Sequence, residues 1–134
     1  SLGTKLKTVE DLMLSGSKIP FINENSNMKK ALKLITEKKL GFLIAIDKKK
    51  YTTGIITDGQ IRRESEKNNS LVQLQVKKLM TKNPISVDKD MLAAKSLGIM
   101  SEKKITSLCV HKKNRPKKTI GVLHIHNILD EKIS

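Results

Sequence analysis

The sequence predicts a mixed α/β (α+β) protein built from two β-α-β-β-α motifs that pack as a pseudo-twofold pair. The first observation is an internal repeat, in which residues 36–46 (TEKKLGFLIAI) are answered by residues 101–111 (SEKKITSLCVH). The second is a glycine-led apolar strand after each copy, at 54–59 (GIITDG) and at 121–126 (GVLHIH). A period of about 65 residues exceeds that of a solenoid unit and favours two half-domains. A cleft between such halves is where ligands are expected.

The first motif is predicted over residues 8–67. Met28, Ala31 and Ile35 recur at helical spacing behind a run of capping residues, which predicts a helix. The apolar run that follows is typical of a strand buried on both faces. The elements expected are, in order, a helix at 7–14, a strand at 20–22, a helix at 27–39, strands at 42–46 and 53–57, and a helix at 58–66.

A linker at 68–74, rich in Asn and Ser, is predicted to join this motif to a second one over 75–133. Asp88 or Asp90 is expected to cap the long helix of the second motif. A loop with Pro116 is expected between its last two strands. The elements expected are a helix at 75–80, a strand at 85–87, a helix at 90–103, strands at 107–111 and 119–123, and a helix at 125–132.

The composition narrows the class of protein. The chain has 134 residues, enough for one compact domain or two small halves, and so few aromatic residues that its core must be aliphatic. No apolar run approaches the length of a membrane span, so no membrane partner is expected. The single cysteine, Cys109, excludes an internal disulfide, and a cytoplasmic location is expected. Because the chain begins Ser1-Leu2-Gly3 without Met, we interpret it as a fragment of a longer parent.

The net charge of +14 raises the hypothesis of nucleic-acid binding. Lys outnumbers Arg 24 to 3, whereas nucleic-acid surfaces favour Arg forks and stacking aromatic rings. Nucleic acid is therefore an unlikely partner. The Lys residues fall in small clusters, such as 48–50 and 112–113, which indicates a solvated surface. The more specific alternative is that the Lys residues together produce a positive electrostatic field that attracts an anionic metabolite.

The order β-α-β-β-α, repeated once, resembles a tandem pair of CBS domains, also called a Bateman module, over residues 8–132. In nucleotide-binding members of that family the last strand and helix carry G-h-x-[ST]-x-x-[DN], where h is apolar. The resemblance implies that the hydroxyl binds phosphate beside a helix N-terminus and that the last residue holds ribose. The first copy has Thr57 at the hydroxyl and Gln60 at the end. The second copy has His124 at the hydroxyl and Asn127 at the end.

Two local strings resemble the C-terminal CBS pair of arabinose-5-phosphate isomerases: Thr57-Asp58-Gly59-x-x-Arg62-Arg63, and His124-x-His126 after Gly121. The family's usual Asp is Gln60 in the first string and Asn127 after the second. In that family a sugar-isomerase (SIS) domain precedes the pair. That domain interconverts ribulose 5-phosphate and arabinose 5-phosphate on the route to the Kdo sugar of lipopolysaccharide. The resemblance therefore implies a non-catalytic fragment whose partner is the SIS domain of its own parent isomerase.

The residues expected to bind a ligand are Thr57, Asp58, Gln60, Arg62, Arg63, His124, His126 and Asn127. Some of them have a simpler alternative. Thr57 and Asp58 fit a helix cap, and one of the two arginines fits a solvated charge. The two histidines lack a third ligand nearby, so no metal is predicted. No catalytic residue and no required cofactor are predicted either, since no P-loop, nucleophile motif or zinc spacing is present.

Three functions remain as hypotheses. The first is a regulatory module that senses an anionic effector in the cleft, with a nucleotide such as AMP or ATP, a sugar phosphate, or CMP-Kdo as candidate ligands. The alternative is a purely structural module with a vestigial cleft, which would form a homodimer through an apolar face on the helices at 58–66 and 124–132. The third, nucleic-acid binding, depends on the charge alone.

Overall fold

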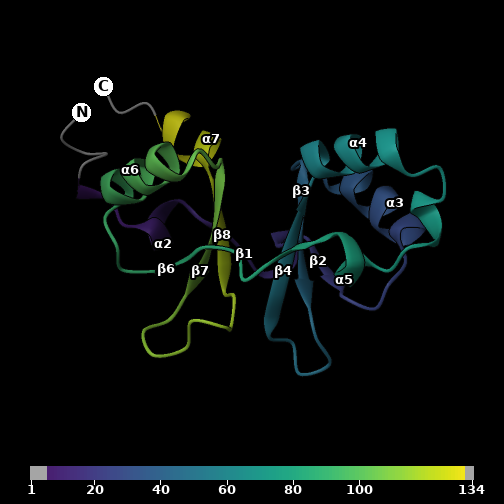
Figure 1. The fold of residues 1–134 in the computed structure, drawn as a ribbon. Helices are drawn as coiled ribbons and strands as arrows, with labels where there is room; N and C mark the ends of the chain where they lie inside the picture. The colour runs from purple at the N-terminus through teal and green to yellow at the C-terminus, as the bar shows by residue number, and fades with distance from the viewer. Residues whose placement is uncertain (1–5, 132–134) are drawn as a thin grey trace. The chain divides into compact units, whose positions relative to one another are not determined.

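The computed structural model describes residues 6–131 and divides into two compact units (Figure 1). One unit is Pro20–Pro84, and the other joins Ser1–Ile19 to Ile85–Ser134. Each unit contains one four-stranded sheet with helices, so the predicted mixed α+β class is confirmed. Within the described residues, no helix combines the length and the apolar character needed to cross a bilayer.

The unit Pro20–Pro84 has the strand order β2-β3-β4-β5. Strand β2 is parallel to β3, and the other two pairs are antiparallel. Its elements are β2 (Phe21–Asn23), α3 (Met28–Lys38), β3 (Phe42–Ile46), β4 (Thr52–Thr57), α4 (Asp58–Lys67), the 3-10 turn η2 (Leu71–Gln73), α5 (Val76–Leu79) and β5 (Thr81–Lys82).

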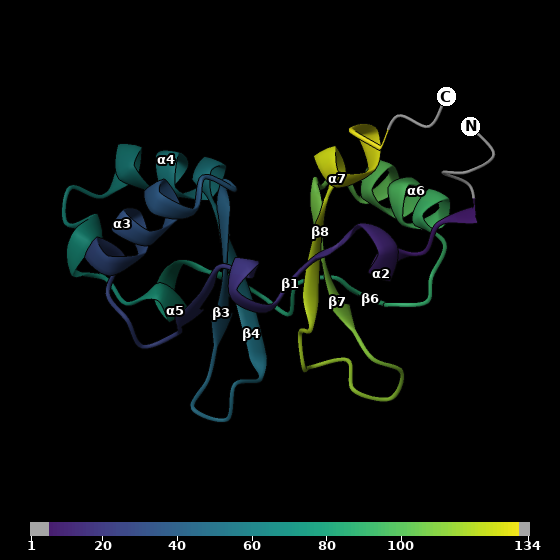
Figure 2. The ribbon, with the colours of Figure 1, turned by 180° about the vertical axis from the view of Figure 1, so that it is seen from behind.

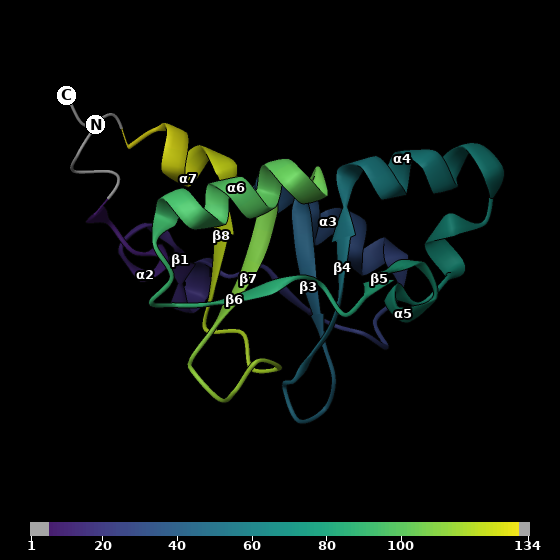
Figure 3. The same cartoon turned by 60° about the vertical axis from the view of Figure 1, so that its left-hand side comes forward.

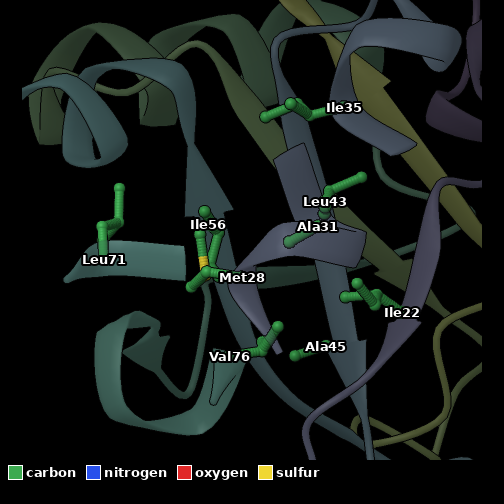
Figure 4. Packing of buried hydrophobic residues seen from close by; sticks show 9 residues of the cluster. All are labelled: Ile22, Met28, Ala31, Ile35, Leu43, Ala45, Ile56, Leu71 and Val76. Atoms are coloured by element: carbon green, nitrogen blue, oxygen red, sulfur yellow. The ribbon is translucent and has the colours of Figure 1, made fainter. Parts of the chain in front are cut away.

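Helix α3 forms as its sequence predicts. The side-chain Oδ1 of Asn27 accepts a hydrogen bond from the Lys30 N–H at 2.9 Å and so caps the first turn. Met28, Ala31 and Ile35 are buried on the face toward the sheet, where they meet β3 and β4 (Figure 4). Leu71, which lies inside the stretch predicted as a linker, and Val76, just after that stretch, complete the same core.

The second unit has the strand order β1-β8-β7-β6, with β6 parallel to β7 and the other pairs antiparallel. Its core gathers Val9, Met100, Leu108 and Leu123 between the sheet and the helices. Its elements are α2 (Val9–Leu12), β1 (Leu14–Ser15), the 3-10 turn η1 (Gly16–Lys18), β6 (Ser86–Asp88), α6 (Ala93–Lys103), β7 (Ser107–His111), β8 (Gly121–His124) and α7 (Ile125–Leu129).

Each sheet takes one strand from the other sequence motif. Strand β5 lies at the start of the second motif but pairs with β4, as Figure 3 shows. Strand β1 lies in the first motif but pairs with β8, as Figure 2 shows from behind. Sequence reasoning missed both strands and placed Leu14 inside the helix at 7–14. A strand of two residues has no periodicity from which it could be predicted.

A Leu-Met pair occurs in each half of the sequence, at Leu12-Met13 and at Leu79-Met80, and within each unit its methionine contacts one of the repeated glycines. A Cβ at Gly54 would lie 2.6 Å from the Cγ of Met80, which immediately precedes β5. A Cβ at Gly121 would lie 3.0 Å from the Cγ of Met13, which immediately precedes β1. Both separations are shorter than side chains tolerate, so glycine is what lets each methionine pack onto the last strand of the sheet.

The long helix of the second motif begins later than predicted. Its N-cap is Leu92, not Asp88 or Asp90. Asp88 instead accepts a hydrogen bond at Oδ1 from the Asp90 N–H at 2.8 Å, which closes a turn before the helix. The short side chain therefore caps the turn rather than the helix. Helix α7 also ends at Leu129, earlier than the predicted 132, which lies outside the described residues.

Candidate functional site

The junction between β4 and α4 is held by a reciprocal pair of hydrogen bonds. The Oγ1 of Thr57 accepts from the Gln60 N–H at 3.2 Å, and the Oε1 of Gln60 accepts from the Thr57 N–H at 2.9 Å. This is a capping box, which satisfies two backbone donors that a helix start leaves open. The capping role expected as the simpler alternative for Thr57 is confirmed. Both side chains are half-buried.

Gln60 also links this junction to the exchanged strand. Its Nε2 donates a hydrogen bond to the Oγ1 of Thr81 in β5 at 2.6 Å. Sequence reasoning did not single out Thr81, which is 21 residues away in the chain. The sequence does not indicate this contact, because the exchange of β5 between the motifs is what brings it beside β4 and within reach of Gln60.

Asp58 is the first residue of α4, and Arg63 lies in the second turn with its guanidinium directed back toward the first. The Asp58 N–H donates to the carbonyl oxygen of Gly41 at 2.9 Å. Its carboxylate lies 3.3 Å from where a Cβ of Gly41 would stand, at a φ of +79° that favours glycine. The guanidinium of Arg63 folds back over Gly59, with Nη1 3.2 Å from the position of a Cβ there. Both Asp58 and Arg63 are exposed, so a carboxylate and a cation face solvent beside one helix start.

Arg62 differs from its neighbour. It is exposed on α4, and its carbonyl oxygen accepts from the Ser65 hydroxyl at 2.7 Å. No contact described for it reaches the first turn. The structure thus brings Thr57, Gln60 and Arg63 together at one junction and leaves Arg62 outside that group.

The second unit has the same arrangement between β8 and α7, with histidine in the capping position. The Nδ1 of His124 accepts from the His126 N–H at 3.1 Å, and the His124 N–H donates to the Oδ1 of Asn127 at 2.8 Å. Because Nδ1 accepts, the neutral imidazole of His124 carries its proton on Nε2. The rings of His124 and His126 stack, with centroids 4.8 Å apart and an interplanar angle of 22°.

Burial lowers the pKa of His124 below its ordinary value of 6.5, and the nearby His126 lowers it further, while Asp130 acts in the opposite direction. Since the folded pKa is depressed, the unfolded chain takes up the proton first as the pH falls. Stability is therefore expected to decrease as the pH falls below about 6.5, until the lowered folded pKa is reached.

Urea unfolding between about pH 8 and about pH 5, above the range where most carboxylates titrate, measures this dependence. Replacing His124 by Asn keeps a capping acceptor and removes the titrating group, so the dependence should flatten. An equally steep dependence in His124→Asn would mean that another group causes it.

Other reactive side chains lie apart from these junctions. Cys109 is buried, which raises the pKa of its thiol to about 11 and keeps it protonated at neutral pH. His111 pairs through Nδ1 with the Ser86 hydroxyl at 2.6 Å. Across the part of the chain that the structure describes, no group of three or more His, Cys, Asp or Glu side chains could hold a metal ion.

Helix α4 does not carry the apolar face that the oligomerisation hypothesis expects of it. It buries no residue, and its exposed side chains are all polar or charged. They are Asp58, Arg62, Arg63, Ser65, Glu66 and Lys67. On α7, by contrast, Leu129 is exposed.

Comparison with known proteins gives one family. A model described as "CBS domain" matches residues 9–67 and again residues 76–134. Arabinose 5-phosphate isomerase KdsD of Salmonella typhi is 35% identical to the chain over 130 residues, which are 96% of the chain and 39% of the relative. The chain thus spans about two fifths of the length of this curated relative.

Solved structures agree on the fold. A conserved protein of uncharacterised function from Pyrococcus horikoshii has a TM-score of 0.82 at 19% identity, covering 97% of each chain. CBSX2 in complex with AMP has a TM-score of 0.78 at 25% identity, covering 92% of this chain and 93% of its own.

Proposed function

The chain belongs to the CBS domain family as a tandem pair of motifs, and from that premise we propose that it is the ligand-sensing regulatory region of an arabinose-5-phosphate isomerase. The predicted resemblance to CBS pairs and to these isomerases is confirmed. The matched relative is more than twice as long as this chain, which leaves room in such a parent for a separate SIS domain. That domain would carry out the aldose–ketose isomerisation and would be the chain's first partner.

In this proposal the parent works in the cytoplasm, on the route to the Kdo sugar of lipopolysaccharide, and this region adjusts its activity. The effector is an anion, either a nucleotide such as AMP or ATP or a nucleotide-sugar such as CMP-Kdo. The net charge of +14 suits either class, and no required cofactor is invoked.

One observation carries the proposal: the same capped strand–helix junction occurs in both units, with a cation or an imidazole beside it. In one unit the Arg63 guanidinium lies over the first turn of α4, where it can pair with a phosphate. In the other, His126 is exposed and stacked on His124 at the start of α7. The similarity to CBSX2, a protein solved with AMP, supports a nucleotide as the ligand class.

The bond between Gln60 and Thr81 offers a route from ligand to structure. In this proposal the ligand hydroxyl accepts the Nε2 hydrogen that Gln60 now donates to the Thr81 hydroxyl, and so replaces Thr81 as its partner. Strand β5 would then lose its hydrogen bond to Gln60 of α4. Because the state with this bond and the state without it differ in affinity for the ligand, ligand binding shifts the equilibrium between the two states.

The first experiment measures thermal unfolding with AMP, ATP, arabinose 5-phosphate and CMP-Kdo. A bound effector at a hundred times its Kd should stabilise the chain by about 2.7 kcal/mol and raise its Tm. The variant Arg63→Gln should lose most of this shift, while the matched variant Arg62→Gln should keep it. Each shift is compared with the ligand-free Tm of the same variant. Equal losses in both variants, or no shift with any compound, would contradict the proposed site.

The alternative is an oligomerisation module that binds nothing, in which two CBS pairs form a homodimer. It is favoured by the way the side chains of Thr57, Gln60 and Asn127 are already engaged in capping within the chain. Sedimentation equilibrium with and without the compounds separates the two hypotheses. A stable dimer with no ligand effect would favour the structural module.

A further inference from the structure

The loop between β7 and β8 concentrates positive charge. Its sequence, Lys112 to Lys118, reads KKNRPKK, five cations in seven residues with no acidic side chain and no apolar one besides Pro116. Two turns shape it, because the Arg115 N–H donates to the Lys112 carbonyl at 2.9 Å and the Lys118 N–H donates to the Arg115 carbonyl at 3.2 Å. Residues 112–117 are all exposed, and Figure 3 shows the loop extending past the ends of its strands.

Within its own unit, this charge is not a share of a generally basic surface. The unit that holds the loop, residues 1–19 and 85–134, contains thirteen Lys and Arg against seven Asp and Glu. Five of those thirteen cations lie in the loop, and the other eight are nearly balanced by the seven acidic residues. The unit outside the loop is therefore close to neutral, with one positive charge in excess. Within residues 6–131, none of the five cations forms an ion pair.

The equivalent loop of the other unit provides an internal comparison. Between β3 and β4 it has three lysines, Lys48 to Lys50, beside Asp47. The Oδ1 of Asp47 accepts from the backbone N–H groups of Lys49 and Tyr51, both at 2.9 Å, so its carboxylate stays within the loop. The two hairpins thus share a position in the fold, but only the loop at 112–118 lacks an acidic residue.

We propose that the loop at 112–118 binds the anionic phospholipid surface of a membrane. This departs from the expectation of no membrane partner, which depended on the lack of a spanning segment and not on surface charge. A convex tip brings several cations to a flat surface at once, and mobile head groups can adjust to them. Nucleic-acid strands are instead held by grooves and by stacked aromatic rings, and this loop has no aromatic residue. Four of the five cations are Lys, compact charges that need no paired geometry. With no large apolar side chain to insert, the binding is electrostatic and reversible.

The test measures co-sedimentation of the 134-residue chain with vesicles of phosphatidylcholine alone, and with vesicles of three parts phosphatidylcholine to one part phosphatidylglycerol. Binding is expected only to the anionic vesicles, at about 0.1 M salt, and should be lost at about 1 M salt. Each cation strengthens such binding about five-fold. The triple variant Lys112→Gln, Lys113→Gln, Lys117→Gln should therefore bind about 100-fold more weakly.

A matched triple variant on α3 controls for net charge: Lys29→Gln, Lys30→Gln, Lys33→Gln, all at exposed positions. It should keep most of the binding, and circular dichroism should show both triple variants folded. Equal losses in the two triple variants, or no preference for anionic vesicles, would overturn the proposal. So would tighter binding to a DNA duplex that depends on the same loop, because the partner would then be nucleic acid.

Discussion

Replacing Leu123 by alanine is expected to lower the free energy of unfolding by about 3 kcal/mol. Leu123 is 0% exposed in β8, an interior strand of its sheet. It is paired with Leu108 on β7 and belongs to the core that Met100 and Ile128 bring from the helices. Truncation removes apolar contact and leaves a cavity that packed neighbours fill only in part. Urea unfolding followed by circular dichroism measures the loss.

The control is Leu129→Ala on the adjoining helix. Leu129 is 51% exposed, so its truncation removes little buried area and should cost less than about 1 kcal/mol. A similar loss in both variants would mean that Leu123 is not packed in the core. Since domains of this size are stable by only about 5–15 kcal/mol, the expected loss for Leu123→Ala is a large part of the whole.

The elements that the sequence predicts well are those with a long, regular apolar pattern. The buried face of α3 and the run Phe42–Ile46 follow from residue spacing alone, and both are confirmed. The exchanged strands Leu14–Ser15 and Thr81–Lys82 could not be predicted, because two residues show no period. Their position depends on the packing of Met13 and Met80 against glycines far along the chain.

In the candidate site too, the local contacts could be predicted from the sequence and the long-range contacts could not. The capping role of Thr57 follows from its local sequence, because a hydroxyl before a helix accepts from the first turn. The contact from Gln60 to Thr81 is long-range and needs the strand exchange. Arg62 and Arg63 are both exposed on one helix, so the sequence does not distinguish them. The guanidinium of Arg63 reaches the first turn because Arg63 is four residues after Gly59, which leaves room for it.

Replacing Gly121 by alanine is expected to lower the free energy of unfolding by about 1–3 kcal/mol. The new Cβ would lie 3.0 Å from both the Met13 Cγ and the Leu14 carbonyl oxygen, with the Met13 sulfur nearer still. The side chain of Met13 can move, but the carbonyl belongs to β1, which is paired to β8 at this point. Relief therefore requires the backbone of β1 to move slightly against its partner β8. The free energy of unfolding in urea measures the cost.

Two further variants test whether the exchanged segment causes this loss. Adding Met13→Ala to Gly121→Ala removes one side of the clash, so the double variant should lose less stability than the sum of the single variants. Gly98→Ala is the matched control, because Gly98 is exposed within α6 and has no atom within 4 Å of an added Cβ. It should stabilise the chain by about 0.5–1 kcal/mol through helix propensity. Strictly additive losses for Gly121 and Met13 would mean that Met13 does not lie against this strand. Gly98→Ala and Gly121→Ala are expected to change the free energy of unfolding in opposite directions. The cost of an added Cβ at Gly121 therefore comes from the exchanged segment beside it, not from the loss of glycine itself.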